Sequence, residues 1–284
     1  MRVISIPKRK IIEWQDYSKR KPVASEMGEL IDSDTIVYEG GRPVLFYTAL
    51  PKDILADMRE VVKTTKYTNT NRTRGLPTKS STFGAMPRVA LRCNYCRFTT
   101  YTRTERANFE RILRFRNHIA QFYEKYFPEN YSESMSEIQK LIHPDWFAGA
   151  DPSLWLTCNI NVNIATPYHR DSGNMKTQFS NVIILRENVR GGELVCPEFG
   201  ISLSQRDGAL TIFDGQSIAH GVMPIYTKSP GAYRAAIVFY TLQEMKHCLS
   251  LKGEVDRVKA AHTASERVSC GARREKIKKM KGRK

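Results

Sequence analysis

Two histidines and one aspartate are the residues of this sequence whose types and spacing best support metal chemistry. His169 and Asp171 stand in the run Tyr-His-Arg-Asp-Ser-Gly-Asn at 168–174, and His220 follows 51 residues after His169. Two imidazoles and one carboxylate hold non-haem Fe(II) on one face and leave positions open for an oxidant. In an extended segment, positions i and i+2 project to the same side, so His169 and Asp171 can bind one ion together.

An arginine 14 residues after His220 completes this candidate site. Arg234 lies in the run Tyr-Arg-Ala-Ala-Ile-Val-Phe-Tyr at 233–240, which is typical of a strand. A buried guanidinium on a neighbouring strand can pair bidentately with a carboxylate, which suits the distal carboxylate of 2-oxoglutarate. Each motif alone is common, but their order predicts an oxygenase that uses Fe(II), 2-oxoglutarate and O₂.

Short strands must carry these residues. After Leu154 the sequence reads LWLTCNINVNIA, FSNVIIL, GELVCPEF, ALTIFDG and YRAAIVFYTL, with Gly, Pro, Asn and Asp between the segments. β-branched and aromatic residues in short runs predict strands. His220 comes directly after the ALTIFDG run, where a jelly roll would supply a ligand.

Helical periodicity marks the first half of the chain. Residues 51–65 and 104–127 each carry an apolar stripe, and 132–142 follows as a shorter helix with Ser132 or Ser134 as the cap. Residues 66–87 are rich in Thr, Asn, Arg, Gly and Pro without a period, which predicts a loop. We therefore expect an α+β fold, with a double-stranded β-helix (jelly roll) core and helices packed on one side.

Basic charge is concentrated in three stretches of this chain of 284 residues. The net charge is +16, of which 267–284 carries +8, 1–21 carries +5 and 72–116 carries +9, so the rest of the chain stands at −6. Such stretches suit a polyanion, because each neutralised phosphate releases counterions. Nucleic acid is the expected partner, and the alternative is that the ends act only as solubilising or import signals.

The sequence also indicates where the protein resides. No apolar run reaches the length of about 18 residues that a membrane span needs, and no apolar stretch leads to a cleavage site at the N-terminus. We expect an intracellular monomer without membrane contact, nuclear if its source is eukaryotic. Six cysteines are too few for a disulfide framework, which predicts reduced thiols. Cys93 and Cys96 form one C-x-x-C without a second pair, which favours free thiols over zinc.

The sequence resembles the TET/JBP dioxygenases, which hydroxylate the 5-methyl group of pyrimidines in DNA. The resemblance covers roughly 157–242 and rests on H-R-D-S-G-N at 169–174 and R-A-A-I-V-F-Y at 234–240. It implies that Asn174 contacts a flipped base and that Tyr240 stacks on it. An enzyme that acts on a base within a duplex must flip it out, read its edge by hydrogen bonds and stack on its face. The alternative is that Asn174 closes a turn and Tyr240 is a core residue.

The resemblance is to compact members of the family and implies a substrate. We expect duplex DNA with a 5-methylpyrimidine, oxidised from 5-methylcytosine to 5-hydroxymethylcytosine or further, with ascorbate as a candidate stimulant. Leu242 stands where the animal enzymes usually carry His, which leaves thymine as an alternative substrate. A protein or RNA hydroxylase with the same iron core would also fit these motifs, as would a catalytically silent DNA-binding jelly roll. The expected contacts to the DNA backbone are Arg88, Arg92, Arg97 and Arg103.

These expectations divide the chain into four regions. We expect a basic N-terminal segment at 1–21 and a helical and loop region at 22–153 that supports the core and contacts DNA. The jelly-roll catalytic core at 154–250 forms a single domain with 22–153, and a basic tail follows at 251–284.

Overall fold

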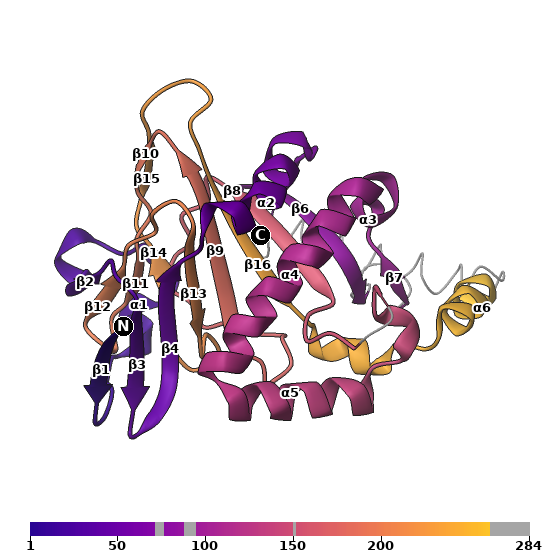
Figure 1. The fold of residues 1–284 in the computed structure, drawn as a ribbon, viewed down its shortest axis with the longest axis horizontal. Coiled ribbons are helices and arrows are strands. Elements are labelled where there is room, and N and C mark those ends of the chain that lie inside the picture. Colours follow the sequence, from indigo (N-terminus) through magenta and orange to yellow (C-terminus); the bar gives the residue numbers. More distant parts are fainter. Residues whose placement is uncertain (72–76, 88–94, 150–151, 262–284) are drawn as a thin grey trace, which may run out of the picture.

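A ten-stranded sheet runs through the molecule and joins strands from both halves of the sequence (Figure 1). The computed structural model describes residues 1–71, 77–87, 95–149 and 152–261. In spatial order the strands are β1 (Arg2–Ile6), β3 (Thr35–Glu39), β4 (Arg42–Ala49), β13 (Ala209–Phe213), β9 (Ser180–Glu187), β16 (Tyr233–Tyr240), β8 (Thr157–Val162), β6 (Pro77–Pro87) and β5 (Thr68–Asn71), with β7 (Cys96–Phe98) paired to β6.

A smaller sheet packs on one face of the large one and closes the jelly roll. Its strands are β14 (Gly221–Val222), β11 (Leu194–Cys196), β12 (Ile201–Leu203) and β2 (Glu29–Ile31), and β10 (Val189–Gly191) pairs separately with β15 (Ile225–Thr227). Leu194 and Leu203 of the small sheet share a buried cluster with Leu45, Tyr47 and Phe213 of the large sheet. This apolar layer holds the two sheets together, and the expected jelly-roll core is confirmed.

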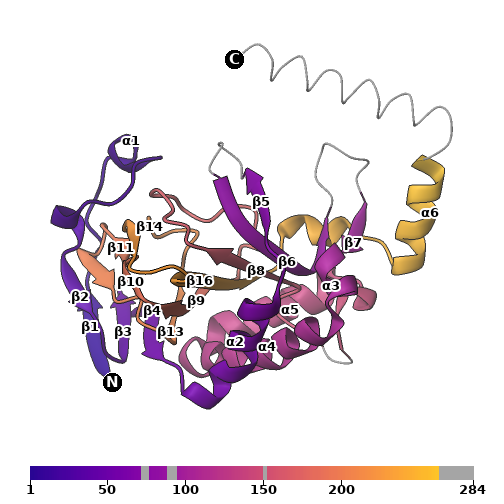
Figure 2. The same cartoon turned by 90° about the horizontal axis from the view of Figure 1, so that it is seen from above.

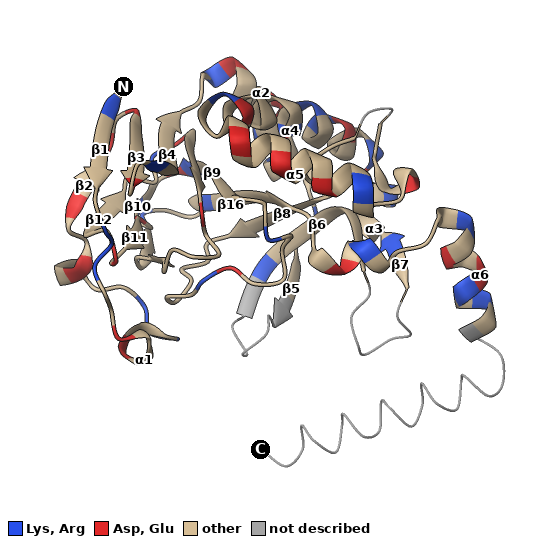
Figure 3. Cartoon of the chain, turned by 90° about the horizontal axis from the view of Figure 1, so that it is seen from below, with Lys and Arg blue, Asp and Glu red and all other residues tan. Residues whose placement is uncertain are grey.

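Of the helices in the described residues, the three longest cover the other face of the large sheet (Figure 2). Apolar side chains of α2 (Lys52–Thr64), α4 (Arg106–Tyr126) and α5 (Pro128–Leu141) pack on it, whereas Asp and Glu alternate with Lys and Arg on their outer surfaces (Figure 3). The expected helical layer on one side is thus confirmed. None of the described helices is long and apolar enough to span a membrane. The shorter helices are α1 (Trp14–Tyr17), α3 (Thr100–Thr104) and α6 (Leu251–Ala261), with 3₁₀ turns η1 (Ala24–Glu26), η2 (Pro144–Trp146) and η3 (Gln243–His247).

Alternation along the central strands places core residues on one face of the sheet and candidate site residues on the other. Ile183 and Leu185 on β9 and Ile237 and Phe239 on β16 belong to the cluster beneath the helices. Successive side chains of a strand point to opposite faces. The even-numbered residues of β9 and β16, Arg234 among them, therefore face away from the helices.

The expectation of a loop over residues 66–87 is wrong. β5 and β6 lie there, and β6 pairs with β8 from Lys79 opposite Val162 to Gly84 opposite Thr157. The pairing with β8 overrides the weak strand propensity of the Asn, Pro and Gly residues of this stretch, because the ladder satisfies the backbone and buries Phe83 completely. Gly84 has φ +96°, and a Cβ there would clash with the carbonyl oxygen of Leu156. The strands β1 to β4 were likewise not predicted.

The helix expected at 132–142 begins earlier than predicted. α5 starts at Pro128, because proline fits the first helical turn, where no intrahelical partner for its N–H is needed. Neither Ser132 nor Ser134 caps it, and the buried Ser134 instead donates its hydroxyl to the carbonyl of Thr177 at 2.8 Å. The helices expected at 51–65 and 104–127 are confirmed as α2 and α4.

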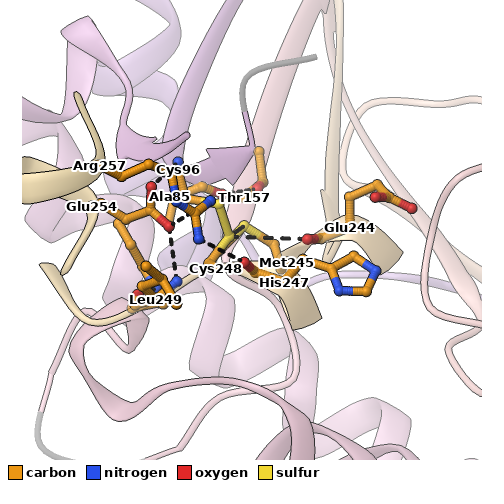
Figure 4. The surroundings of a disulfide bond; sticks show 11 residues. Ala85, Cys96, Thr157, Glu244, Met245, His247, Cys248, Leu249, Glu254 and Arg257 are labelled. Atoms are coloured by element: carbon orange, nitrogen blue, oxygen red, sulfur yellow. Dashed lines mark hydrogen bonds and ion pairs between the residues drawn. A yellow bond between two sulfur atoms is a disulfide. The ribbon is translucent and has the colours of Figure 1, made fainter. Parts of the chain in front are cut away.

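A disulfide joins Cys96 of β7 to Cys248, so the expectation of reduced thiols is wrong at this pair (Figure 4). The two Cα atoms are 5.6 Å apart, although 152 residues separate them in the sequence. No local sequence pattern could reveal that these two cysteines are neighbours. Beside the bond, Glu254 accepts hydrogen bonds from the backbone N–H groups of Cys96 at 3.0 Å and Leu249 at 2.8 Å. Cys158 and Cys196 are free, as expected, and both are buried, whereas Cys93 and Cys270 lie outside the described residues.

Removal of this disulfide should destabilise the fold. Cys248→Ser is expected to lower the free energy of unfolding by about 2–5 kcal/mol, because the bond restricts the unfolded chain. Urea denaturation without reductant measures the change. A dithiol reductant should lower the stability of the wild type to that of the variant and leave the variant unchanged. Titration of six free thiols in the untreated, denatured wild type would contradict the bond.

Candidate metal centre

The structure brings His169, Asp171 and His220 together. One ligand atom from each lies within 4.8 Å of the others, and Oδ1 of Asp171 is 3.5 Å from Nε2 of His169 and 3.8 Å from Nε2 of His220. The backbones of His169 and His220 exchange two hydrogen bonds of 2.9 Å in an isolated antiparallel bridge. This exchange unites the two segments, which are 51 residues apart in the sequence.

Hydrogen bonds orient each of these side chains. Nδ1 of His169 lies 2.9 Å from the carbonyl oxygen of Pro167, and Nδ1 of His220 lies 2.9 Å from that of Ile218. A proton held on Nδ1 leaves Nε2 as the ligand atom of both rings. Ser180 donates its hydroxyl to Oδ2 of Asp171, so Oδ1 remains directed at the two imidazoles.

The charge states within the cluster suit a divalent cation. Burial lowers the pKa of His220, which is 4% exposed, to about 4, and the charge of His169 contributes. Desolvation raises the pKa of Asp171, but the hydrogen bond from His169 and the charges of both histidines outweigh it and bring the pKa to about 2. Near neutral pH, His220 is therefore neutral and Asp171 is ionised, which is the form that a metal requires.

Close approach of the backbone makes glycine necessary next to the cluster. A Cβ at Gly215 would clash with Oγ of Ser180 and would lie 2.6 Å from Oδ2 of Asp171. The carbonyl of Gly215 accepts the N–H of Asp171 at 2.8 Å. The donor set of two imidazoles and one carboxylate fits Fe(II) with open coordination positions. Within the described ranges, no other group of three such side chains could hold an ion.

The buried Arg234 is the centre of a candidate binding site for a carboxylate. Its side chain is 2% exposed, its Nε has no hydrogen-bond partner among the described residues, and its Nη2 donates to Oε1 of Gln205 at 3.4 Å. Arg186, which pairs with it from β9, donates to backbone carbonyls rather than to a carboxylate. Burial and the charge of Arg186 lower the pKa of Arg234 to about 9, against the opposing charge of Glu193. A guanidinium in this environment fits a carboxylate ligand such as that of 2-oxoglutarate.

Asn174 lies beside the strand end that carries Tyr240. Asn174 and Leu242 form an isolated antiparallel bridge, in which Met175 N–H donates to Thr241 O at 2.9 Å. Asn174, Tyr240 and Leu242 are half-buried. Asn174 and Tyr240, the two residues implied as base contacts, are thus related in space, because Asn174 pairs with the residue two positions after Tyr240.

The expected DNA-backbone arginines are only partly described. Arg88 and Arg92 lie outside the described residues. Arg97 is half-buried on β7, and Arg103 is exposed in the last turn of α3.

Sequence reasoning missed two buried asparagines of β8. Asn159 and Asn161 alternate with Cys158 and Ile160, which face the helices, so both amides lie on the face that carries Arg234. The Oδ1 atoms of both have no hydrogen-bond partner among the described residues, although Nδ2 of Asn159 donates to Thr82. Alternating Asn in an apolar strand was the available signal, because such amides need partners when buried.

A jelly roll with two histidines, one aspartate and a buried arginine defines an Fe(II)- and 2-oxoglutarate-dependent dioxygenase. Residues 87–243 match the model Tet_JBP, described as the oxygenase domain of the 2OGFeDO superfamily. Since the match spans more than half of the 284 residues, the chain belongs to the Tet_JBP family. It is an oxidoreductase that uses Fe(II), 2-oxoglutarate and O₂, as predicted, which argues against a catalytically silent jelly roll.

Among solved structures, one with a TM-score above 0.5 supports this fold. NgTET1 in complex with 5mC DNA is 14% identical, with a TM-score of 0.58 over 82% of this chain and 90% of that chain. A 2OG-Fe(II) oxygenase family oxidoreductase from Burkholderia pseudomallei is 15% identical, with a TM-score of 0.42 over 68% and 84% of the two chains. A prolyl-4-hydroxylase from Pseudomonas putida is 14% identical, with a TM-score of 0.41 over 70% and 92%. No curated protein matches the sequence.

Loss of the Arg234 guanidinium should weaken cosubstrate binding. Arg234→Met is expected to raise the 2-oxoglutarate concentration for half-maximal succinate formation about 10–100-fold, because it removes charge-assisted hydrogen bonds. Arg114→Met, at an exposed position of α4, is the control and should behave as wild type. Equal weakening of 2-oxoglutarate and DNA binding in Arg234→Met would contradict the role of this residue.

Proposed function

We propose that this enzyme hydroxylates the 5-methyl group of a pyrimidine flipped out of duplex DNA, with 5-methylcytosine as its first substrate. The pairing of Asn174 with Leu242 carries the proposal, because an amide three residues after Asp171 then lies beside the strand end with Tyr240. A flipped base needs a hydrogen-bonding group at its edge and a ring at its face. The likeness in fold to NgTET1, solved with 5mC DNA, agrees with this substrate.

The protein groups divide the work of this reaction. We assign His169, Asp171 and His220 as the metal ligands, held by the two Nδ1 contacts and by Ser180. The bound iron would supply the oxidation, in which 2-oxoglutarate, O₂ and the methyl base become succinate, CO₂ and the hydroxymethyl base. Arg234 would bind the distal carboxylate of 2-oxoglutarate, so that the other end of the molecule faces the cluster.

A contact surface for DNA is proposed at residues 1–21. This segment lies against the metal-binding loops, because Arg9 donates to the carbonyl of Ser217 at 3.0 Å and Arg170 lies 4.9 Å from the ring centroid of Trp14. In Figure 2, α1 lies on the opposite side of the sheet from α2, α4 and α5. The exposed lysines of this segment can neutralise phosphates around an extruded base, and they are Lys8, Lys10, Lys19 and Lys21.

Thymine is a second candidate substrate because of Leu242. Cytosine presents an amino group at its 4-position and thymine an oxygen, so a polar side chain can distinguish them by hydrogen bonding. Leu242 is apolar and half-buried at the end of the strand that carries Tyr240. It can form a hydrogen bond with neither group.

A comparison of three duplexes tests the function. Three duplexes are incubated with enzyme, Fe(II), 2-oxoglutarate and O₂. The first contains 5-methylcytosine, the second contains thymine as its only 5-methylpyrimidine, and the third contains unmodified cytosine with uracil in place of thymine. Mass spectrometry of the nucleosides should detect 5-hydroxymethylcytosine from the first duplex. Product from thymine alone would favour the second candidate. No modified base in any duplex, with a peptide or RNA oxidised instead, would refute a DNA substrate.

Two variants separate base recognition from metal chemistry in this assay. Asn174→Ala should lower base hydroxylation about tenfold or more, because a hydrogen bond to the base is lost, while succinate still forms without base oxidation. Asp171→Ala should abolish both products, since it removes a proposed metal ligand. Normal base hydroxylation by Asn174→Ala would show that this amide only closes the turn.

The salt dependence of DNA affinity tests the surface at residues 1–21. Replacement of Lys8, Lys10, Lys19 and Lys21 by Ala should reduce the slope of log affinity against log salt by about 0.9 for each lysine that contacts a phosphate. The matched control replaces four exposed lysines of the helical layer, which are Lys52, Lys63, Lys125 and Lys140. Equal slopes for both variants would place the DNA elsewhere.

A further inference from the structure

A buried carboxylate outside the metal cluster connects the two segments that carry the ligands. Glu198 lies in the turn between β11 and β12 and is 5% exposed. Its Oε1 accepts a hydrogen bond from Nη2 of Arg170 at 2.8 Å, and its Oε2 accepts the backbone N–H of Ala219 at 2.6 Å. Arg170 stands between His169 and Asp171, and Ala219 directly precedes His220. Each oxygen of one carboxylate therefore holds one of the two segments.

Arg170 reinforces this connection from the exposed side. Its Nε donates to the carbonyl of Ser217 at 3.0 Å, so one guanidinium contacts both Glu198 and the segment that leads to His220. The ring of Trp14 lies against the same guanidinium. Backbone pairing of His169 with His220 joins the segments at one point, and the bonds of Glu198 and Arg170 add contacts on either side of it.

The energetics of burial give these contacts their rigidity. A buried carboxylate that loses a partner bears a large desolvation cost, so Glu198 favours the conformation in which both bonds are made. A ligand set that is already ordered loses less conformational entropy when a metal binds. A rigid connection next to the ligands should therefore appear in metal affinity as well as in folding stability.

We infer that Glu198 is a positioning residue of the metal centre, which holds the His169–Asp171 and His220 segments in register before the metal binds. The inference rests on the ligand assignment made under the proposed function and does not depend on the identity of the substrate.

Metal titration of the protein tests this role, with Glu198→Gln compared against Glu254→Gln. Glu254 is a matched control, because it is 3% exposed, accepts two backbone N–H groups and pairs with Arg257, yet lies beside the disulfide (Figure 4). Calorimetric titration of the metal-free proteins with Mn(II), without DNA or 2-oxoglutarate, gives their affinities. Glu198→Gln should bind about 10–100-fold more weakly than wild type. Glu254→Gln should lose folding stability but keep the wild-type affinity.

A second variant tests the positioning role of Glu198 if Glu198→Gln does not fold. Arg170→Met removes the same connection at a side chain that is 36% exposed, so it should fold and should also weaken Mn(II) binding. In the double variant, the two losses should not add, because both remove one connection. Wild-type affinity in Glu198→Gln, or in Arg170→Met if only that variant folds, would overturn the inference. Wild-type affinity in Asp171→Ala would instead refute the ligand assignment, and a failure to oxidise DNA would leave the titration result unaffected.

Discussion

The exchange of two backbone hydrogen bonds between His169 and His220 is the contact on which the site depends. It joins the segment before β9 to the segment after β13, and it brings the ligand atoms of three side chains within 4.8 Å of one another. Ser180 and Glu198 add contacts that the backbone pairing does not supply. Ser180 donates to Oδ2 of Asp171, and Glu198 accepts the backbone N–H of Ala219, next to His220. The candidate metal centre thus lies on loops whose two ends are strands of the sheets.

The two faces of the large sheet serve different purposes, and single strands contribute to both. On β16, Ile237 and Phe239 fill the core beneath the helices, whereas Arg234 and Tyr240 face the jelly-roll interior. The same division holds on β8, where Ile160 is core and the asparagines face inward. Packing against the helices therefore sets the position of the face that carries Arg234 and the two asparagines.

Prediction from the sequence succeeded where a local pattern has a single physical meaning. The apolar stripes of α2 and α4 and the β-branched runs of β8, β9, β13 and β16 were identified, because each of these patterns lies within a single element. It failed over 66–87, where polar strands form only because β8 supplies the pairing partner. It failed again at Cys96 and Cys248, since the proximity of two cysteines separated by 152 residues depends on the whole fold.

The sequence by itself determined the chemical types and their order: an H-x-D pair, a later histidine and an arginine on the last long strand. These follow from side-chain chemistry and from the two-residue period of a strand, which are local properties. Only the tertiary structure decided that Glu198 holds both ligand segments, that Ser180 orients Asp171 and that Asn174 pairs with Leu242. Such contacts depend on strand register and on turns between distant segments, and no local stretch of sequence contains that information.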